Sequence, residues 1–182
     1  MVGGAGAVVL ALVAAVVLVG DSGEDEQQAA AGAEDAVSLR EGGAEERLLA
    51  TLPSTVDADR CEGVEPADNV VAQVVCDGAA GRGGPDRVSY MLLADGDSLA
   101  ARLDSAVSAT AIEVCPGRIQ SPGPWRRNAS PERVAGTVFC GSRDGVAVMG
   151  WSDVDRLVFA EISSSAAAPT PQGLYDWWSR HS

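Results

Sequence analysis

The four cysteines are the residues of this sequence whose chemistry is easiest to assign. Intervals of 14, 38 and 24 residues separate Cys61, Cys76, Cys115 and Cys140. A structural zinc site needs ligands clustered as in C-x-x-C, often with His, and the single His181 lies near the C-terminus. An even number of cysteines outside the cytosol indicates disulfides instead. We therefore expect two disulfides and no metal site.

Four cysteines allow three pairings. We predict Cys61–Cys76 and Cys115–Cys140, because each pair joins a cysteine in a loop to the end of the strand that follows it. In the chain-entropy model, closing loops of this length stabilises the fold by roughly 3 kcal/mol each.

The segment CPGRIQSPGPWRR, which begins at Cys115, is the best candidate for a binding site. It carries Trp125 beside Arg126 and Arg127, and it also contains Arg118. Trp and Arg are frequent anchors of binding sites, so these four residues are the predicted ligand-binding residues. In the alternative interpretation, the indole fills the edge of the core and the arginines balance nearby acidic residues.

Motifs for catalysis or cofactor binding fit the sequence poorly. The run Asp95-Gly96-Asp97 begins like a calcium loop, but Ala100 and Ala106 stand where that loop needs Gly and Glu. Asp153 and Asp155 are typical of a turn, and no pattern marks two carboxylates that must meet for acid–base chemistry. We expect no catalytic residue and no cofactor. An enzyme that acts on envelope material through unidentified carboxylates is the alternative.

The charge of the chain argues against nucleic-acid binding. Its net charge is −13, and all thirteen basic residues are Arg. Residues 21–47 carry nine acidic residues and two Arg, so −7 of this charge lies in that segment. An acidic chain repels phosphate backbones, and we therefore expect no nucleic-acid partner.

A long apolar segment opens the sequence. Val2 to Gly20 contains no charged residue and is long enough to cross the hydrocarbon core as a helix. The segment lacks the basic start of a signal peptide, and Leu18-Val19-Gly20 is a poor cleavage site. We therefore favour an uncleaved membrane anchor over a signal peptide. Residues 21–44, acidic and without aromatic residues, are predicted to be a disordered linker, and residues 45–182 an extracytoplasmic domain.

Periodicity predicts an α+β domain over residues 45–182. Five strands are indicated by short β-branched runs bounded by turn residues, over residues 70–76, 87–93, 134–140, 146–151 and 156–162. Three helices are indicated, over residues 45–52, 97–107 and 171–180. We predict an antiparallel sheet of about five strands with the helices on one face. The layer between them is predicted to contain Tyr90, Phe139, Trp151, Phe159, Trp177 and Trp178.

Two parts of the chain follow one pattern. VVAQVVC and VAGTVFC are both β-rich runs that end in Cys, each with another Cys upstream and a helix downstream. A diverged duplication and a shared architecture without common origin both explain this similarity.

The order LLATLP, VVAQVVC, CPGRIQSPGPW, GTVFC, AVMGW and LYDWW, from Leu48 to Trp178, resembles an extracytoplasmic domain of actinobacteria. This domain follows the transmembrane helix in membrane-anchored serine/threonine protein kinases. The resemblance implies an extracellular sensor or ligand-binding role but no particular ligand. We expect the ligand to be a small molecule, a wall fragment or a protein. The chain departs from such kinases because it contains no Gly-rich ATP loop, H-R-D or D-F-G motif. The expected function is therefore non-catalytic ligand binding by a single-pass membrane protein, and a structural envelope module is a further alternative.

Overall fold

The computed structural model describes residues 43–78, 84–164 and 170–181. The predicted anchor at residues 2–20 and nearly all of the predicted linker lie outside these residues. Within the described part of the chain, no helix has the length and apolar character needed to cross a membrane. Residues 43–49 are helical and Ala44 is fully buried, so this helix includes two residues that precede the predicted domain boundary at residue 45.

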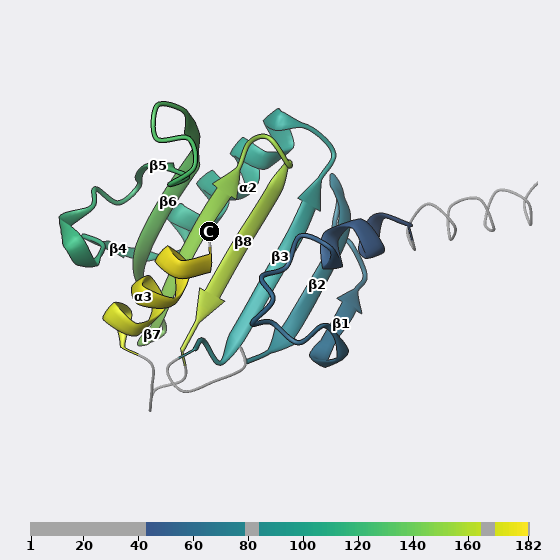
Figure 1. Cartoon of the computed structure of the whole chain (residues 1–182), viewed down its shortest axis with the longest axis horizontal. Coiled ribbons are helices and arrows are strands. Elements are labelled where there is room, and N and C mark those ends of the chain that lie inside the picture. The colour runs from purple at the N-terminus through teal and green to yellow at the C-terminus, as the bar shows by residue number, and fades with distance from the viewer. Residues whose placement is uncertain (1–42, 79–83, 165–169, 182) are drawn as a thin grey trace, which may run out of the picture. The chain divides into compact units, whose positions relative to one another are not determined.

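An antiparallel sheet forms the body of the domain (Figure 1). Its eight strands in the described chain are β1 (Cys61–Val64), β2 (Val70–Asp77), β3 (Arg87–Leu93), β4 (Ala111–Glu113), β5 (Gly123–Arg126), β6 (Val134–Arg143), β7 (Val146–Asp153) and β8 (Val158–Ser163). The spatial order is β1-β2-β3-β8-β7-β6-β4, and β5 pairs with β6 as well. The prediction of an antiparallel α+β fold is confirmed, but the sheet has more strands than the five expected. The strands that are not among the five predicted, β1, β4 and β5, are short and lie at the edges.

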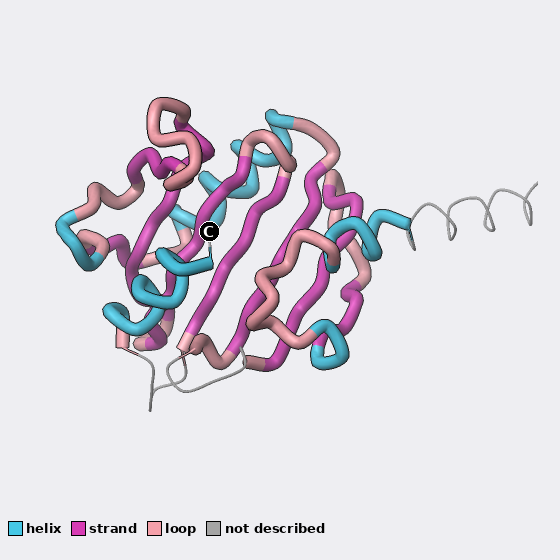
Figure 2. Tube along the Cα trace, in the orientation of Figure 1, coloured by secondary structure: helices cyan, strands magenta, loops and turns pink. Residues whose placement is uncertain are grey.

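The hairpins follow from the turn chemistry of the sequence. β6 and β7 are joined through Asp144 and Gly145, whose φ angles of 53° and 79° are both positive. Two-residue hairpin loops require this conformation, and Asp-Gly adopts it readily. Figure 2 shows the long central strands running side by side between these turns.

Helices cover both faces of the sheet, so the prediction of helices on one face is wrong. α2 (Gly96–Ser108) buries Leu99 and Ala106 on one face, in a cluster with Phe139 and Phe159. α3 (Pro171–His181) and the helical residues 43–49 pack on the other face. The aromatic residues predicted to share one layer are therefore divided between the two faces.

The physical reason is the composition of the central strands. Successive side chains of a strand point to opposite faces. In β8, Val158 and Ala160 belong to the cluster under α3, whereas Phe159 between them belongs to the cluster under α2. A nearly continuous apolar run of this kind is typical of a strand buried on both faces.

The start of α2 also differs from the prediction. The helix begins at Gly96 and not at residue 97, and its N-cap is Asp95, whose Oδ1 accepts a hydrogen bond of 2.8 Å from the backbone N–H of Ser98. Hydrogen bonds from Ser98 to the carboxylate hold the pKa of Asp95 below its ordinary value. Asp97 lies within the first turn, where a negative charge also stabilises the helix.

Both predicted disulfides are present. Cys61 lies directly opposite Cys76 in the β1–β2 ladder, with Cα atoms 3.9 Å apart. Cys115 is bonded to Cys140 of β6, with Cα atoms 5.2 Å apart. Each bond therefore attaches a segment at an edge of the sheet to the adjacent inner strand.

The two parts of the chain with similar sequence patterns share this edge-to-strand disulfide. The second part nevertheless contributes three long strands, β6 to β8, and its helix α3 lies on the opposite face from α2.

Candidate functional site

The predicted binding segment lies along the β6 edge of the sheet, under α3. It contains the 3-10 turn η2 (Pro116–Arg118) and strand β5. The Cys115–Cys140 disulfide holds its start. In the middle of the segment, the Ser121 hydroxyl accepts a hydrogen bond of 2.8 Å from the backbone N–H of Cys140. The same hydroxyl donates a hydrogen bond of 3.1 Å to the carbonyl oxygen of Cys140. The segment is thus fixed to β6 at three places, through the disulfide, this hydroxyl and the β5 ladder.

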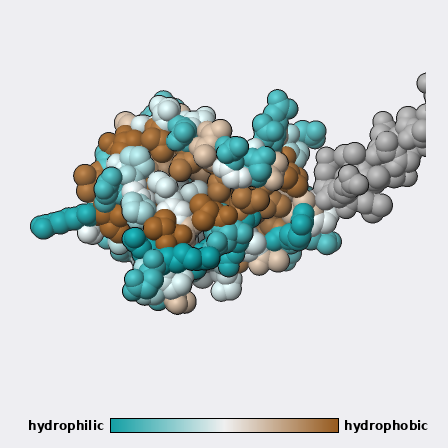
Figure 3. Space-filling model, turned by 90° about the horizontal axis from the view of Figure 1, so that it is seen from above, coloured by the Kyte–Doolittle hydropathy of each residue, from teal (hydrophilic) through white to brown (hydrophobic). Residues whose placement is uncertain are grey.

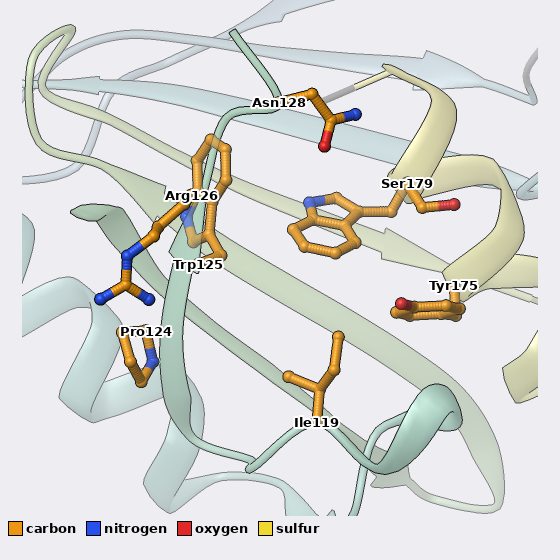
Figure 4. Close-up of a pocket in the computed structure, with 8 residues that line it drawn as sticks. Ile119, Pro124, Trp125, Arg126, Asn128, Tyr175 and Ser179 are labelled. Atoms are coloured by element: carbon orange, nitrogen blue, oxygen red, sulfur yellow. The ribbon is translucent and has the colours of Figure 1, made fainter. Parts of the chain in front are cut away.

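A pocket of about 310 Å³ opens between this segment and α3 (Figure 4). The segment and the residues after it contribute Ile119, Pro124, Trp125, Arg126 and Asn128, and α3 contributes Tyr175, Trp178 and Ser179. Figure 4 shows Ile119 and Tyr175 between β5 and α3, whereas the side chains of Pro124 and Arg126 extend from the other, exposed side of β5.

Trp125 forms part of the pocket wall and part of the core. Its side chain is buried, and its Nε1–H donates a hydrogen bond of 2.8 Å to the carbonyl oxygen of Ser152. Its ring meets that of Trp178 edge to face, with centroids 5.8 Å apart. The alternative interpretation, in which this indole fills the edge of the core, therefore describes its packing well, and one side of the residue still lines the pocket.

Arg127 is held by carboxylates outside the pocket. Its guanidinium forms an ion pair with the buried Asp153 and a second one, at 3.4 Å, with Asp155. It also lies over the Trp125 ring, 5.2 Å from the centroid. Because its charge is neutralised and it does not line the pocket, its contribution is to position Trp125.

Arg126 and Arg118 are the two arginines of the segment without a carboxylate partner. Both are exposed, and neither forms an ion pair or side-chain hydrogen bond with any residue that the structure describes. Arg126 lines the pocket. Arg118, which has a positive φ of 64°, ends η2 and is not among the lining residues. The structure therefore brings Trp125 and Arg126 together at one site.

Sequence reasoning missed the contribution of α3. Tyr175, Trp178 and Ser179 lie three and four residues apart, the spacing that places side chains on one helical face. This spacing was the available signal, but it also fits a purely apolar face. The indole Nε1–H of Trp178 is buried and has no hydrogen-bond partner within the described structure. A buried donor left unpaired costs about 1–3 kcal/mol, which an acceptor on a ligand would offset.

The acidic residues brought together by the fold are paired with arginines. Asp153 contacts Arg127 and Arg156, and Asp155 contacts Arg127 and Arg133. Both carboxylates are therefore engaged in ion pairs with guanidinium groups. Among residues 43–78, 84–164 and 170–181, no group of three or more His, Cys, Asp or Glu is placed to hold a metal ion.

A second cavity, of about 440 Å³, lies on the opposite face, between α2 and the strands β2 and β3. Its lining is mainly apolar and includes Val70, Met91 and Leu93. The guanidinium there, Arg102, is already engaged, because it donates to the Met91 sulfur at 3.2 Å and lies over the Phe159 ring at 4.8 Å. The cavity beside α2 thus differs from the pocket under α3, whose lining residue Arg126 has no carboxylate partner in the described structure.

The sequence and the fold were both compared with known proteins. No protein-family model, curated protein or solved structure matches the chain.

Proposed function

We propose that this chain is a non-catalytic, extracytoplasmic ligand-binding or sensor domain, held at the membrane by residues 2–20, and that it binds its ligand in the pocket between β5 and α3. The observation that carries the proposal is the uncommitted guanidinium of Arg126 beside the aromatic wall formed with Trp125. A pocket with an apolar wall and a few convergent polar groups is the usual form of a small-molecule site.

The extracytoplasmic location is supported by two independent features. The domain contains two disulfides, and disulfides form and persist mainly in oxidising compartments outside the cytosol. The apolar run at residues 2–20 is long enough to anchor a chain that has been exported. The resemblance to the post-transmembrane domains of actinobacterial kinases points in the same direction.

A ligand site also needs walls that hold their shape. The Cys115–Cys140 bond, the Ser121 hydroxyl and the Trp125 indole each fix the binding segment to the neighbouring strands. On the other side, α3 is anchored by the buried residues Leu174 and Trp177. Binding then costs little ordering of the protein, which favours affinity.

The location is tested with the full-length chain carrying a C-terminal tag in bacterial cells. We expect it in the membrane fraction, with all four cysteines unreactive to a maleimide-polyethylene glycol reagent until a reductant is added. A soluble chain with four reactive thiols would contradict the proposal.

The binding site is tested by a fragment screen on the isotope-labelled full-length chain in detergent, followed by NMR. We expect fragments to shift the indole N–H signals of Trp125 and Trp178, with the Trp177 signal as the internal reference. Ser179→Trp should fill the pocket and abolish these shifts. Ser105→Trp, a change at an exposed position of α2, should preserve them. Fragment binding confined to the cavity beside α2 would show that the site is wrongly chosen.

A further inference from the structure

We infer that the ligand of the pocket under α3 is an acidic saccharide, a sugar ring that carries a carboxylate or a phosphate. This inference rests on the proposed function and names the class of ligand for the same site.

The charge of the ligand follows from Arg126. The protein as a whole is strongly acidic, with a net charge of −13. Arg127, next in the chain, is neutralised by Asp153 and Asp155, but Arg126, an exposed residue that lines the pocket, has no carboxylate partner in the described structure. A guanidinium matches the two oxygens of a carboxylate or phosphate through paired hydrogen bonds. An anionic group on the ligand would supply the missing partner.

The body of the ligand follows from the rest of the lining. Tyr175 and Trp178 give an aromatic wall with ring centroids 5.9 Å apart, and Asn128 adds an amide to the lining. The Ser179 hydroxyl already donates to the carbonyl oxygen of Asp176, so it can offer a ligand only an acceptor. A sugar ring has apolar C–H faces and a rim of hydroxyls, so it complements both parts of this lining. A lipid chain would leave the polar side chains without partners, which is costly when water is excluded.

The unpaired donor of Trp178 fits the same class of ligand. Its indole N–H has no acceptor among the described residues. The hydroxyl and acid oxygens of a saccharide are acceptors, whereas an aromatic hydrocarbon offers none. The pocket volume of about 310 Å³ lies at the lower end of the range for small-molecule sites, which suits one or two sugar rings.

A peptide added as a further strand is disfavoured by the sequence of β5. This strand borders the pocket and pairs with β6, and Pro124 lies in its middle. Proline lacks the N–H that an added strand would need, and it is a common means of blocking sheet edges. The occupant is therefore better matched by a compact ring than by an extended chain.

The experiment compares three probes built on one ring. N-acetylglucosamine is neutral, N-acetylmuramic acid adds a carboxylate, and N-acetylglucosamine 1-phosphate adds a phosphate. Binding to the full-length chain in detergent is followed by tryptophan fluorescence and calorimetry, with inorganic phosphate as a fourth probe. We expect at least one acidic sugar to bind tenfold or more tightly than the neutral sugar, and the preferred acid distinguishes a carboxylate from a phosphate ligand.

The role of the guanidinium is tested by Arg126→Gln, with Arg87→Gln as the matched control at another exposed arginine. Arg126→Gln should weaken binding of the acidic sugar at least tenfold and change that of the neutral sugar less than twofold. The control should change neither. Both positions are exposed, so neither substitution should alter the melting temperature. Measuring the melting temperature of each variant verifies that it is folded.

Three results would overturn the inference. These are equal binding of neutral and acidic sugars, equal binding of inorganic phosphate and the sugar phosphate, and no effect of Arg126→Gln. If fragments occupy the pocket but no sugar binds, the ligand class is wrong and the proposed function stands. If fragments also fail to bind there, both proposals fall.

Discussion

Trp125 owes its position to a glycine on the neighbouring strand. Gly136 of β6 lies opposite Trp125 in the β5–β6 ladder. A Cβ atom at Gly136 would collide with the backbone carbonyl of Ser152, the group that accepts the hydrogen bond from the Trp125 indole. The close approach of these backbones therefore sets the depth at which the indole sits.

Gly136→Ala should destabilise the domain by roughly 3 kcal/mol, the upper end for overpacking, because the obstacle is backbone and cannot rotate away. The free energy of unfolding in urea measures the change. Gly96→Ala is the control, since a Cβ there meets no atom within 4 Å and should leave stability nearly unchanged. Equal stabilities of the two variants would show that the β6 backbone adapts to the added methyl group.

Among the elements, the segment before and through β5 depends on covalent attachment more than on its own packing. η2 and β5 are short, and they line one side of the pocket beside the Cys115–Cys140 bond. The Cys61–Cys76 bond plays the corresponding part for β1 at the far edge of the sheet. The two bonds therefore stabilise different ends of the same sheet.

Replacing Cys115 and Cys140 by Ala should increase hydrogen exchange over residues 119–128 and lower stability by about 3 kcal/mol in the chain-entropy model. The Cys61→Ala, Cys76→Ala double variant is the matched control. This control should lower the free energy of unfolding by a similar amount. It should leave hydrogen exchange over residues 119–128 close to that of the unaltered protein. Faster exchange there in both variants would mean that the edges of the sheet are coupled.

α2 depends on its N-cap. Asp95→Ala should lower the melting temperature of the domain and accelerate hydrogen exchange of the Ser98 amide. Asp95→Asn keeps a side-chain acceptor, so it should lower the melting temperature less. Because the folded pKa of Asp95 is lowered, its contribution is present above the unfolded carboxyl pKa of about 3.9 and is lost as pH falls through the folded value. Between pH 7 and pH 2, the melting temperatures of the unaltered protein and of Asp95→Ala should therefore approach each other as the pH falls. A constant difference across this range would show that the carboxylate charge is unimportant.

At the scale of the whole molecule, the sheet carries two apolar clusters on its opposite faces. Tyr90, Trp151, Trp178 and Trp125 form a chain of ring contacts through the larger cluster. Figure 3 shows that apolar residues also reach the surface, in patches separated by polar side chains. The stability of the domain therefore depends on keeping both faces covered and on keeping the buried phenol of Tyr90 uncharged.

Tyr90 makes this requirement visible at alkaline pH. Burial raises the pKa of its phenol well above the ordinary value of about 10, because the phenolate would have to form away from water. Its contribution to stability is complete below pH 10 and is lost as pH rises from there toward the folded pKa. Tyr90→Phe should weaken the dependence of the melting temperature on pH above 10. An unchanged dependence would assign alkaline unfolding to other groups.

The strands with strong β-branched runs could be predicted because they supply their own signal. Residues 87–93 were predicted with the observed bounds, and residues 70–76 within one residue of them. β1 and β5 could not be predicted in this way. They are four residues long and contain Gly or Pro. They become strands because their backbones pair with the longer neighbouring strands β2 and β6.

Local sequence was sufficient to predict the final helix and to favour the observed disulfide pairing among the three possible ones, since these depend on residues close together in the chain. It also marked Trp125 and Arg126 as candidates for binding. Only the tertiary structure decided which arginine remained free, because Asp153 and Asp155 reach Arg127 from another strand. It also placed α3 over β5 to form the pocket, and α2 on the far face. These outcomes depend on contacts between segments distant in sequence, which neither the type of a residue nor its spacing along the chain specifies.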